Sequence, residues 1–278
     1  MGNLILETHT FDSFAHELCY IRVNEQFVAR FIKRLAGDGL VRLLDVAAGT
    51  GLMSSIALAQ ADRGGVEMLP TLLDINRSVL TMARQETDLE EAWFACASVD
   101  ALPFDQAFDG AILGNAIHLL DDSTRESTLD EIWRVLRPGG LFGFNTTFYG
   151  GAYPEESRPF YLAWMRRAIA ELNTRRPGRI RSERVQAMEW LSAEGYRRLV
   201  ECHGFRVVEM RERRVRATQA AVRAISSYTE FAKGALRATD EDADEASRAL
   251  QATIQATFRQ LHMKTLPRNW LEIVAVRL

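Results

Sequence analysis

The chain has 278 residues, of which 47% are hydrophobic and 26% charged, and its formal net charge is −3. This length and composition suit one large globular domain, and the small net charge argues against nucleic acid as a partner. The cysteines at 19, 96 and 202 are far apart and form no C-x-x-C pair, so neither a disulfide framework nor a metal site is expected. With no secretory signal and no apolar run of about 18 residues, we expect a cytoplasmic protein without a membrane span.

The first half of the chain alternates between helix and strand signals. Apolar residues at helical spacing predict a first helix over 11–35, which the glycines of "GDG" (37–39) end. Short apolar runs bounded by turn residues predict strands at 40–46, 70–75, 92–97, 108–114 and 141–148. Helical patterns separate them at 51–61, 76–86 and 123–136. Pro70 is predicted to mark the start of its strand, and "PGG" (138–140) to end the last of these helices.

The second half is predicted to be largely helical. Helices are predicted over 152–173 and 192–204, a strand begins at 205–217, and two helices broken near 238–246 fill 218–263 before a final strand at 270–276. Alternating strands and helices indicate a parallel sheet with helices on both faces. We therefore predict an α/β, Rossmann-like, seven-stranded and mostly parallel sheet in a single domain. Its parts are an N-terminal helical cap (1–36), a cofactor-binding core (37–150), a helical insertion (151–190) and a helical lid (218–263).

The stretch "LLDVAAGTG" (43–51) places a loop of small residues between a strand and a helix. Gly49 and Gly51 permit backbone conformations and close approaches that a Cβ would block, and the free N–H groups at the helix start favour an anion. Asp74 ends the second strand, where a carboxylate can accept hydrogen bonds from both hydroxyls of a ribose. Loop and aspartate together predict a cofactor with a ribose and a charged tail, while the loop alone could be a tight turn. The dinucleotide pattern G-x-G-x-x-G fits poorly, since Ser54 stands at its third glycine.

Five motifs in order resemble class I S-adenosylmethionine-dependent methyltransferases, specifically the small-molecule branch with the ubiquinone and menaquinone biosynthesis methyltransferases. They are "LLDVAAGTG" (43–51), "LLDI" (72–75), "ASVDALPF" (97–104), "FDGAILGNAIHLL" (108–120) and "RVLRPGG" (134–140). The resemblance implies S-adenosylmethionine as the cofactor, with S-adenosylhomocysteine as its product. It places Asp45, Ala47, Gly49 and Gly51 at the methionine end, Asp74 on the ribose, and Ile75 on the adenine.

The resemblance also assigns residues after the third and fourth strands. Ser98 stands where the family commonly has an aspartate for the adenine amine, and Val99 offers its backbone N–H to the ring. Asn115 is expected to contact the cofactor through its backbone. Methyl transfer needs a base only if the acceptor must lose a proton, and His118 is the best-placed candidate. The alternative, weighted equally, is a half-buried histidine that shapes the pocket.

A small-molecule acceptor is the expected partner. In "NAIH" (115–118), alanine and isoleucine replace the two prolines of methyltransferases that act on nucleic-acid bases or glutamine. We predict a closed acceptor pocket bounded by 11–35, 218–263 and the His118 turn, with Tyr20 as a wall residue because Leu18 replaces the tyrosine of the family pattern F-D-x-x-A-x-x-Y. The arginine-rich stretch 158–216 is either a set of solvated helix faces or a docking surface for an acidic carrier protein. A non-methylating reaction on the same fold, such as a cyclisation, is the alternative activity.

Overall fold

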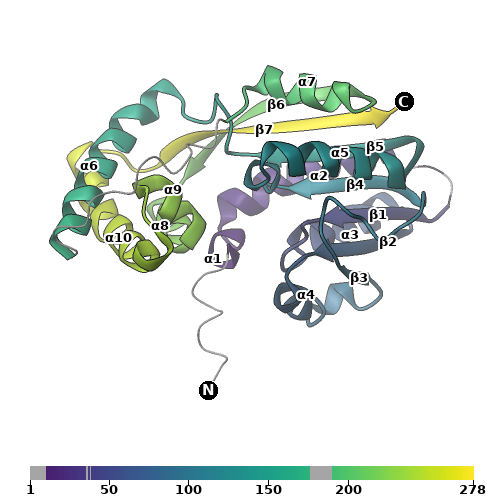
Figure 1. Cartoon of the computed structure of the whole chain (residues 1–278), viewed down its shortest axis with the longest axis horizontal. Helices are drawn as coiled ribbons and strands as arrows, with labels where there is room; N and C mark the ends of the chain where they lie inside the picture. Colours follow the sequence, from purple (N-terminus) through teal and green to yellow (C-terminus); the bar gives the residue numbers. More distant parts are fainter. Residues whose placement is uncertain (1–10, 36, 38, 176–189) are drawn as a thin grey trace. The chain divides into compact units, whose positions relative to one another are not determined.

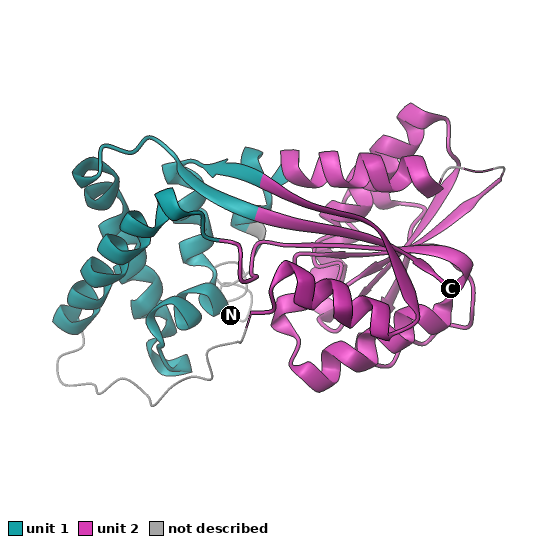
Figure 2. Ribbon diagram, turned by 90° about the horizontal axis from the view of Figure 1, so that it is seen from above, with its two compact units in different colours: residues 1–21, 153–189, 214–269 teal, residues 22–152, 190–213, 270–278 magenta. Residues whose placement is uncertain are grey.

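The computed structural model describes residues 11–35, 37, 39–175 and 190–278 (Figure 1). The chain divides into two compact units (Figure 2). Unit 1 combines residues 1–21, 153–189 and 214–269, and unit 2 combines residues 22–152, 190–213 and 270–278. The chain therefore passes from one unit to the other inside a helix and inside two long strands.

Unit 2 contains a seven-stranded sheet with the order β3-β2-β1-β4-β5-β7-β6. β1 to β5 are parallel where they pair, and β7 runs antiparallel to β5. The strands are β1 (Val41–Val46), β2 (Met68–Asp74), β3 (Trp93–Cys96), β4 (Phe108–Gly114), β5 (Leu136–Thr146), β6 (Phe205–Ala217) and β7 (Leu266–Arg277). This arrangement confirms the predicted Rossmann-like, mostly parallel sheet.

Amphipathic helices cover the sheet. They are α2 (Leu18–Leu35), α3 (Leu52–Gly64), α4 (Arg77–Ala83), α5 (Asp122–Val135) and α7 (Ala193–Cys202), with short 3₁₀ turns η1 (Thr87–Leu89) and η2 (Ile117–Leu119). Phe27 and Phe31 of α2 and Met53 and Ile56 of α3 share one buried cluster, so these two helices cover the same face. Side-chain caps start α4, α5 and α7, where the side chains of the residues before each helix accept backbone N–H groups, as the capping rules predict.

Two predicted boundaries in this unit are wrong. Pro70 lies inside β2, not at its start. β3 pairs with β2 only from Thr71 onward, so at Pro70 that side of β2 has no neighbour and the missing N–H costs no ladder bond. The "PGG" sequence does not end a helix, because α5 ends at Val135 and β5 follows directly. The residues 137–140 form an irregularity where the pairing of β5 with β4 shifts register, and Gly139 supplies a φ of 79°.

Unit 1 is helical and has its own core. Its helices are α1 (Asp12–Ala15), α6 (Arg158–Arg175), α8 (Gln219–Ser227), α9 (Thr229–Leu236) and α10 (Ala243–Gln260), with 3₁₀ turns η3 (Glu155–Ser157) and η4 (Asp240–Asp242). Phe160 and Trp164 of α6 pack against Leu250, Ile254 and Phe258 of α10. This core shows that the helical excursions of the second half bury their apolar faces on one another.

Helix boundaries in unit 1 also differ from prediction. The first predicted helix is broken, since α1 ends at Ala15 and α2 begins at Leu18. The segment 218–263 holds three α-helices instead of two, because α8 ends at Ser227 and Tyr228, in an extended conformation, caps α9. Part of the predicted insertion, residues 176–189, lies outside the described residues. Apolar periodicity cannot detect a one-residue break that leaves the apolar faces on the same side.

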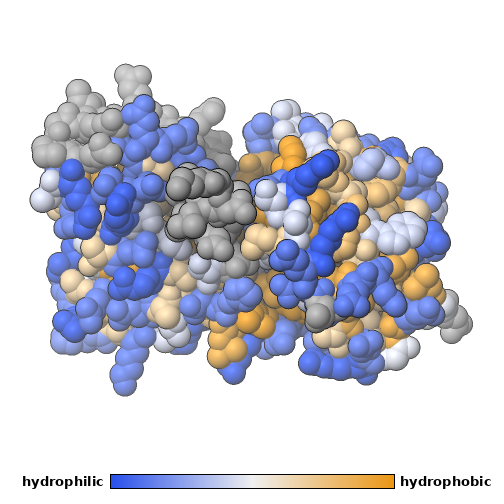
Figure 3. All heavy atoms as spheres, turned by 90° about the horizontal axis from the view of Figure 1, so that it is seen from below, coloured by the Kyte–Doolittle hydropathy of each residue, from blue (hydrophilic) through white to orange (hydrophobic). Residues whose placement is uncertain are grey.

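The surface is mostly hydrophilic on the face drawn in Figure 3, with hydrophobic side chains gathered in smaller patches. Many arginines of the described part of the arginine-rich stretch pair with acidic side chains, among them Arg175 with Glu171 and Arg214 with Glu156. Such pairs are typical of solvated faces. Among the helices that the structure describes, none is long and apolar enough to cross a membrane.

Candidate functional site

The loop between β1 and α3 turns on left-handed residues. Ala47, Gly49 and Gly51 have φ values of 55°, 56° and 90°. A Cβ on Gly51 would lie 2.6 Å from Leu89 Cδ1 and 3.0 Å from Leu72 Cδ2, whereas a Cβ on Gly49 would meet nothing within 4 Å. The two glycines therefore have different roles. Gly51 is required by the packing of side chains under the loop, whereas Gly49 faces open space.

Asp74 ties this loop to the end of β2. One oxygen, Oδ2, accepts the Gly49 N–H at 2.9 Å, and Oδ1 accepts the Asn76 N–H at 2.8 Å. Each oxygen keeps a second lone pair, so both can still accept a hydroxyl. The next side chain, Ile75, is 72% exposed. An exposed isoleucine beside a fixed carboxylate is an arrangement that suits a ribose with a flat base attached.

Asp45 is the buried acid of the site. Its side chain is 1% exposed, and its Oδ2 accepts the Ser54 hydroxyl at 2.7 Å. Its Oδ1 is buried and has no hydrogen-bond partner among the described residues. Burial raises the pKa of Asp45 from about 3.8 to about 7, while the Ser54 hydrogen bonds oppose that rise. A cationic ligand group beside Oδ1 would stabilise the charged form.

The turn after β4 is fixed by asparagine side chains. Asn115 has a left-handed φ of 49° and is buried. Its N–H donates to both the carbonyl and Oδ1 of Asn145 at 3.0 Å, and its own Oδ1 accepts the Thr147 N–H at 3.0 Å. The side chain of Asn115 therefore joins the ends of β4 and β5. Spacing alone gave no sign of this role for the side chain.

His118 lies in η2, directly after that turn. Its side chain is buried, and its ring stacks on Phe148 with centroids 4.0 Å apart. Its Nδ1 is 3.3 Å from Thr146 Oγ1, the oxygen that also accepts the Phe148 N–H at 3.0 Å. Arg125 of α5 donates to the carbonyls of Ile117 and Leu120, which flank the histidine. Phe148 and Thr146 thus contact the ring, while Arg125 fixes the backbone on either side of it.

The remaining predicted site residues lie in two places. Ser98 and Val99 are half-buried and follow β3, and the Ala97 N–H donates to the Asp74 carbonyl at 3.2 Å, which keeps this segment beside β2. Tyr20 belongs to unit 1, where its ring contacts Phe11 and Phe14 at centroid distances of 5.2 and 5.3 Å. Its proposed contact with the acceptor stays a prediction.

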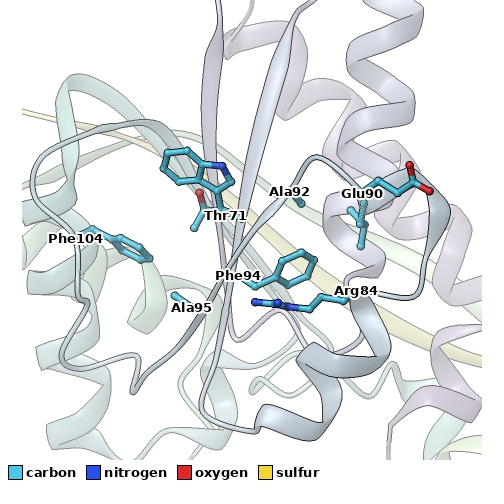
Figure 4. A pocket seen from close by; sticks show the side chains of 9 residues that line it. Thr71, Arg84, Glu90, Ala92, Phe94, Ala95 and Phe104 are labelled. Atoms are coloured by element: carbon cyan, nitrogen blue, oxygen red, sulfur yellow. The ribbon is translucent and has the colours of Figure 1, made fainter.

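A separate pocket lies on the outer edge of the sheet at β3 (Figure 4). Arg84 lies 4.7 Å above the Phe94 ring, and Thr71, Trp93 and Phe104 contribute to the lining. Of the predicted cofactor residues, none lines this pocket. Phe104 is half-buried and contacts the buried Phe108 edge-on.

The loop after β1, the end of β2 and the turn after β4 thus belong to neighbouring strands at their carboxyl ends (Figure 1). Parallel α/β sheets bind nucleotide-like ligands at this edge. Sequence reasoning missed several residues that hold the site together, namely the side chains of Ser54, Arg125, Asn145 and Phe148 and the backbone N–H of Thr147. Only Ser54 carried a signal, because a small polar residue four positions after Thr50 in the first turn of α3 faces the end of β1.

Comparisons with known proteins give the class of the domain that contains this edge. Residues 43–140 match the family described as a methyltransferase domain. A ubiquinone/menaquinone biosynthesis C-methyltransferase UbiE from Methylobacterium nodulans is 38% identical over 105 residues, which are 36% of this chain and 40% of that protein. Another UbiE, from Desulfotalea psychrophila, is 32% identical over 119 residues, 42% of this chain and 46% of that protein.

Solved structures share the fold. A proposed methyltransferase from Bacillus halodurans superposes with a TM-score of 0.53 at 13% identity, covering 91% of this chain and 99% of that one. The [4+2]-cyclase SpnF superposes with a TM-score of 0.51 at 18% identity, covering 90% and 81%. This chain spans less than half the length of the curated relatives it matches. Residues 43–140 therefore match a methyltransferase domain, in agreement with the methyltransferase resemblance that the five motifs carry.

Proposed function

We propose that this protein transfers a methyl group from S-adenosylmethionine to a small-molecule acceptor. The observation that carries the proposal is Asp74, whose carboxylate accepts the Gly49 N–H and ends β2 with both oxygens still able to bind hydroxyls. Such an aspartate supports a ribose site at this loop over a tight turn without a ligand. The matches to the methyltransferase domain and to UbiE proteins support the same cofactor.

The residues present fit this cofactor on three counts. Open space over Gly49 leaves room for a ligand against the loop backbone. The buried, unpartnered Oδ1 of Asp45 can accept from an ammonium group. Exposed Ile75 can pack on an adenine, with Ser98 and Val99 at its edge. When bound, the cofactor supplies an electrophilic methyl group on a sulfonium, so the protein mainly positions the reactants and excludes water.

His118 is the proposed base for acceptors that must lose a proton. If Nδ1 carries the proton, it donates to Thr146 Oγ1 and leaves Nε2 as the unprotonated nitrogen that can take a proton. With the opposite tautomer, Thr146 donates to Nδ1 and His118 only shapes the pocket. The acceptor contacts expected of Tyr20 and of residues 218–263 stay predictions.

The test begins with the cofactor. Calorimetry should show that the protein binds S-adenosylhomocysteine, and that Asp74→Ala loses about 10-fold or more in affinity, because charge-assisted hydrogen bonds of this kind contribute about 1.5–3 kcal/mol. The exposed Asp62→Ala, near the end of α3 and outside the site, serves as the matched control. Unchanged affinity in Asp74→Ala would remove that residue from the site.

A non-methylating reaction on the same fold is the second candidate, and SpnF is an example of a cyclase with this architecture. The two candidates differ in what happens to the cofactor. A methyltransferase releases S-adenosylhomocysteine in step with product, whereas a cyclisation leaves the cofactor unchanged. Assaying its release with a panel of phenolic, enolic and amine acceptors separates them.

A further inference from the structure

Asn24 is an unusual residue for the interior of the helix α2. Its side chain is fully buried, and its Nδ2 donates to no group among the residues that the structure describes. A buried amide donor without an acceptor lowers the free energy of unfolding by about 1–3 kcal/mol. Such groups are therefore rare in folded proteins and call for an explanation. Asn24 lies on no motif and was not predicted to belong to the site.

The orientation of this amide follows from a backbone group. The Asn115 N–H donates to Asn145 Oδ1, so the Nδ2 of Asn145 faces the other way, toward Asn24. That Nδ2 donates to Asn24 Oδ1 at 2.6 Å. The Oδ1 of Asn24 is therefore occupied, and its Nδ2 must point away from Asn145. The backbone N–H of Asn115 therefore sets the orientation of the Asn145 amide, and Asn145 sets that of the Asn24 amide. The assignment of Nδ2 and Oδ1 in both side chains follows from these hydrogen bonds.

Glycine contacts show where on the sheet the donor lies. A Cβ on Gly110, near the start of β4, would touch Leu35 of α2, and a Cβ on Gly143 of β5 would touch Phe31. Asn145 is two residues further along β5 on the same face and meets Asn24. The helix therefore runs against the strand direction, and its early residues lie at the carboxyl ends.

The buried acid Asp45 lies on the same face. A Cβ on Gly114 of β4 would meet Met53 of α3, and Met53 shares a cluster with Phe31 of α2. Ser54, the neighbour of Met53, holds Asp45. One face of the sheet thus presents, at its carboxyl edge, a buried donor on α2 and a buried acceptor on β1.

We infer that Asn24 donates to the carboxylate of the cofactor's amino-acid tail while Asp45 accepts from its ammonium group. This assignment rests on the proposed function. A donor and an anion on one face match a zwitterionic α-amino acid, whose two charges need partners of opposite kind. Asn24 is then a binding residue that the turn after β4 positions through Asn145.

The experiment compares two ligands on the full chain. S-adenosylhomocysteine carries the amino-acid tail, and 5′-methylthioadenosine has the same adenosine and sulfur without it. Asn24→Asp keeps the oxygen that accepts from Asn145 but replaces the donor with a negative charge. Calorimetry should show a loss of about 10-fold or more for S-adenosylhomocysteine and no change for 5′-methylthioadenosine. The same substitution at the exposed Asn173 of α6 is the matched control and should change neither affinity.

The outcomes are distinct. Equal losses for both ligands, or none for S-adenosylhomocysteine, would overturn the role of Asn24 while leaving the cofactor site intact. If the unchanged protein binds neither ligand, the proposed function fails and this inference fails with it. Should Asn24→Asp not fold, judged by its thermal unfolding, Asn24→Ala takes its place with the same expected selectivity.

Discussion

The turns after β1 and after β4 share a left-handed backbone conformation but differ in how their polar groups are used. Each contains a non-glycine residue in the left-handed region, Ala47 with a φ of 55° and Asn115 with a φ of 49°. The turn after β1 leaves space above Gly49 and a buried oxygen on Asp45 that has no partner in the described part of the chain. The turn after β4 fills its own hydrogen bonds through Asn145 and Thr147. The first turn leaves space and an acceptor open, as the proposed ligand site requires, whereas the second turn uses its polar groups within the protein.

The largest effect is expected inside the first turn. Gly51→Val should destabilise the protein strongly, because its Cβ would lie 2.6 Å from Leu89 and the φ of 90° is strained for valine. Gly49→Val also places valine at a left-handed φ, of 56°, but its Cβ meets open space, so it should destabilise the protein less than Gly51→Val and lose S-adenosylhomocysteine binding. Thermal unfolding and calorimetry on the pair separate the two roles. Equal unfolding midpoints would mean that packing does not distinguish these glycines.

The second turn is tested at His118. If the ring is a base, His118→Ala should lower turnover by about 100-fold while S-adenosylhomocysteine affinity stays nearly constant. If the ring only shapes the pocket, His118→Gln should retain most of the turnover. Rates measured with an accepted substrate across pH distinguish the two, because only a base leaves an ionisation in the profile that the glutamine variant loses.

The sequence predicted the parts of the fold and of the two turns that depend on local residue patterns, and it missed those that depend on contacts between distant residues. The strand and helix alternation predicted the sheet. The small residues at 47–51 and Asp74 were predicted to act together, and the structure joins them through the hydrogen bond from the Gly49 N–H to Asp74, while their ribose contact stays a prediction. The hydrogen bonds that join Asn24 to Asn145 and Asn145 to Asn115 could not be predicted in this way. Their partners lie 121 and 30 residues apart in the chain, so no local sequence pattern contains them. The "PGG" error has the same origin, since only pairing with β4 shows that these residues form a strand irregularity.

A smaller effect concerns pH and Asp45. Because burial raises its pKa to about 7, the folded chain binds more protons than the unfolded chain between about pH 4 and 7. Folding stability should therefore fall as pH rises through this window, and Asp45→Asn should remove that decline in urea unfolding. Affinity for S-adenosylhomocysteine should change the other way, rising about 10-fold per pH unit up to about 7, since the ligand's ammonium favours ionised Asp45. A flat affinity profile in the unchanged protein would contradict this contact.

The smallest effect should come from Ser54, which touches the ligand edge only through Asp45. Its hydroxyl donates to Asp45 Oδ2 at 2.7 Å and lowers the pKa that burial raises. Ser54→Ala removes that hydrogen bond from a buried carboxylate, so the pKa of Asp45 should rise further. The midpoint of the affinity profile should then move to higher pH, while affinity well above the midpoint changes little, because the ligand's own contacts remain. Calorimetry over a pH series measures the shift, and Ser55→Ala, one position along α3, is the matched control. An unmoved midpoint would show that Ser54 only packs the start of α3, and the tuning of Asp45 would then rest on its burial alone.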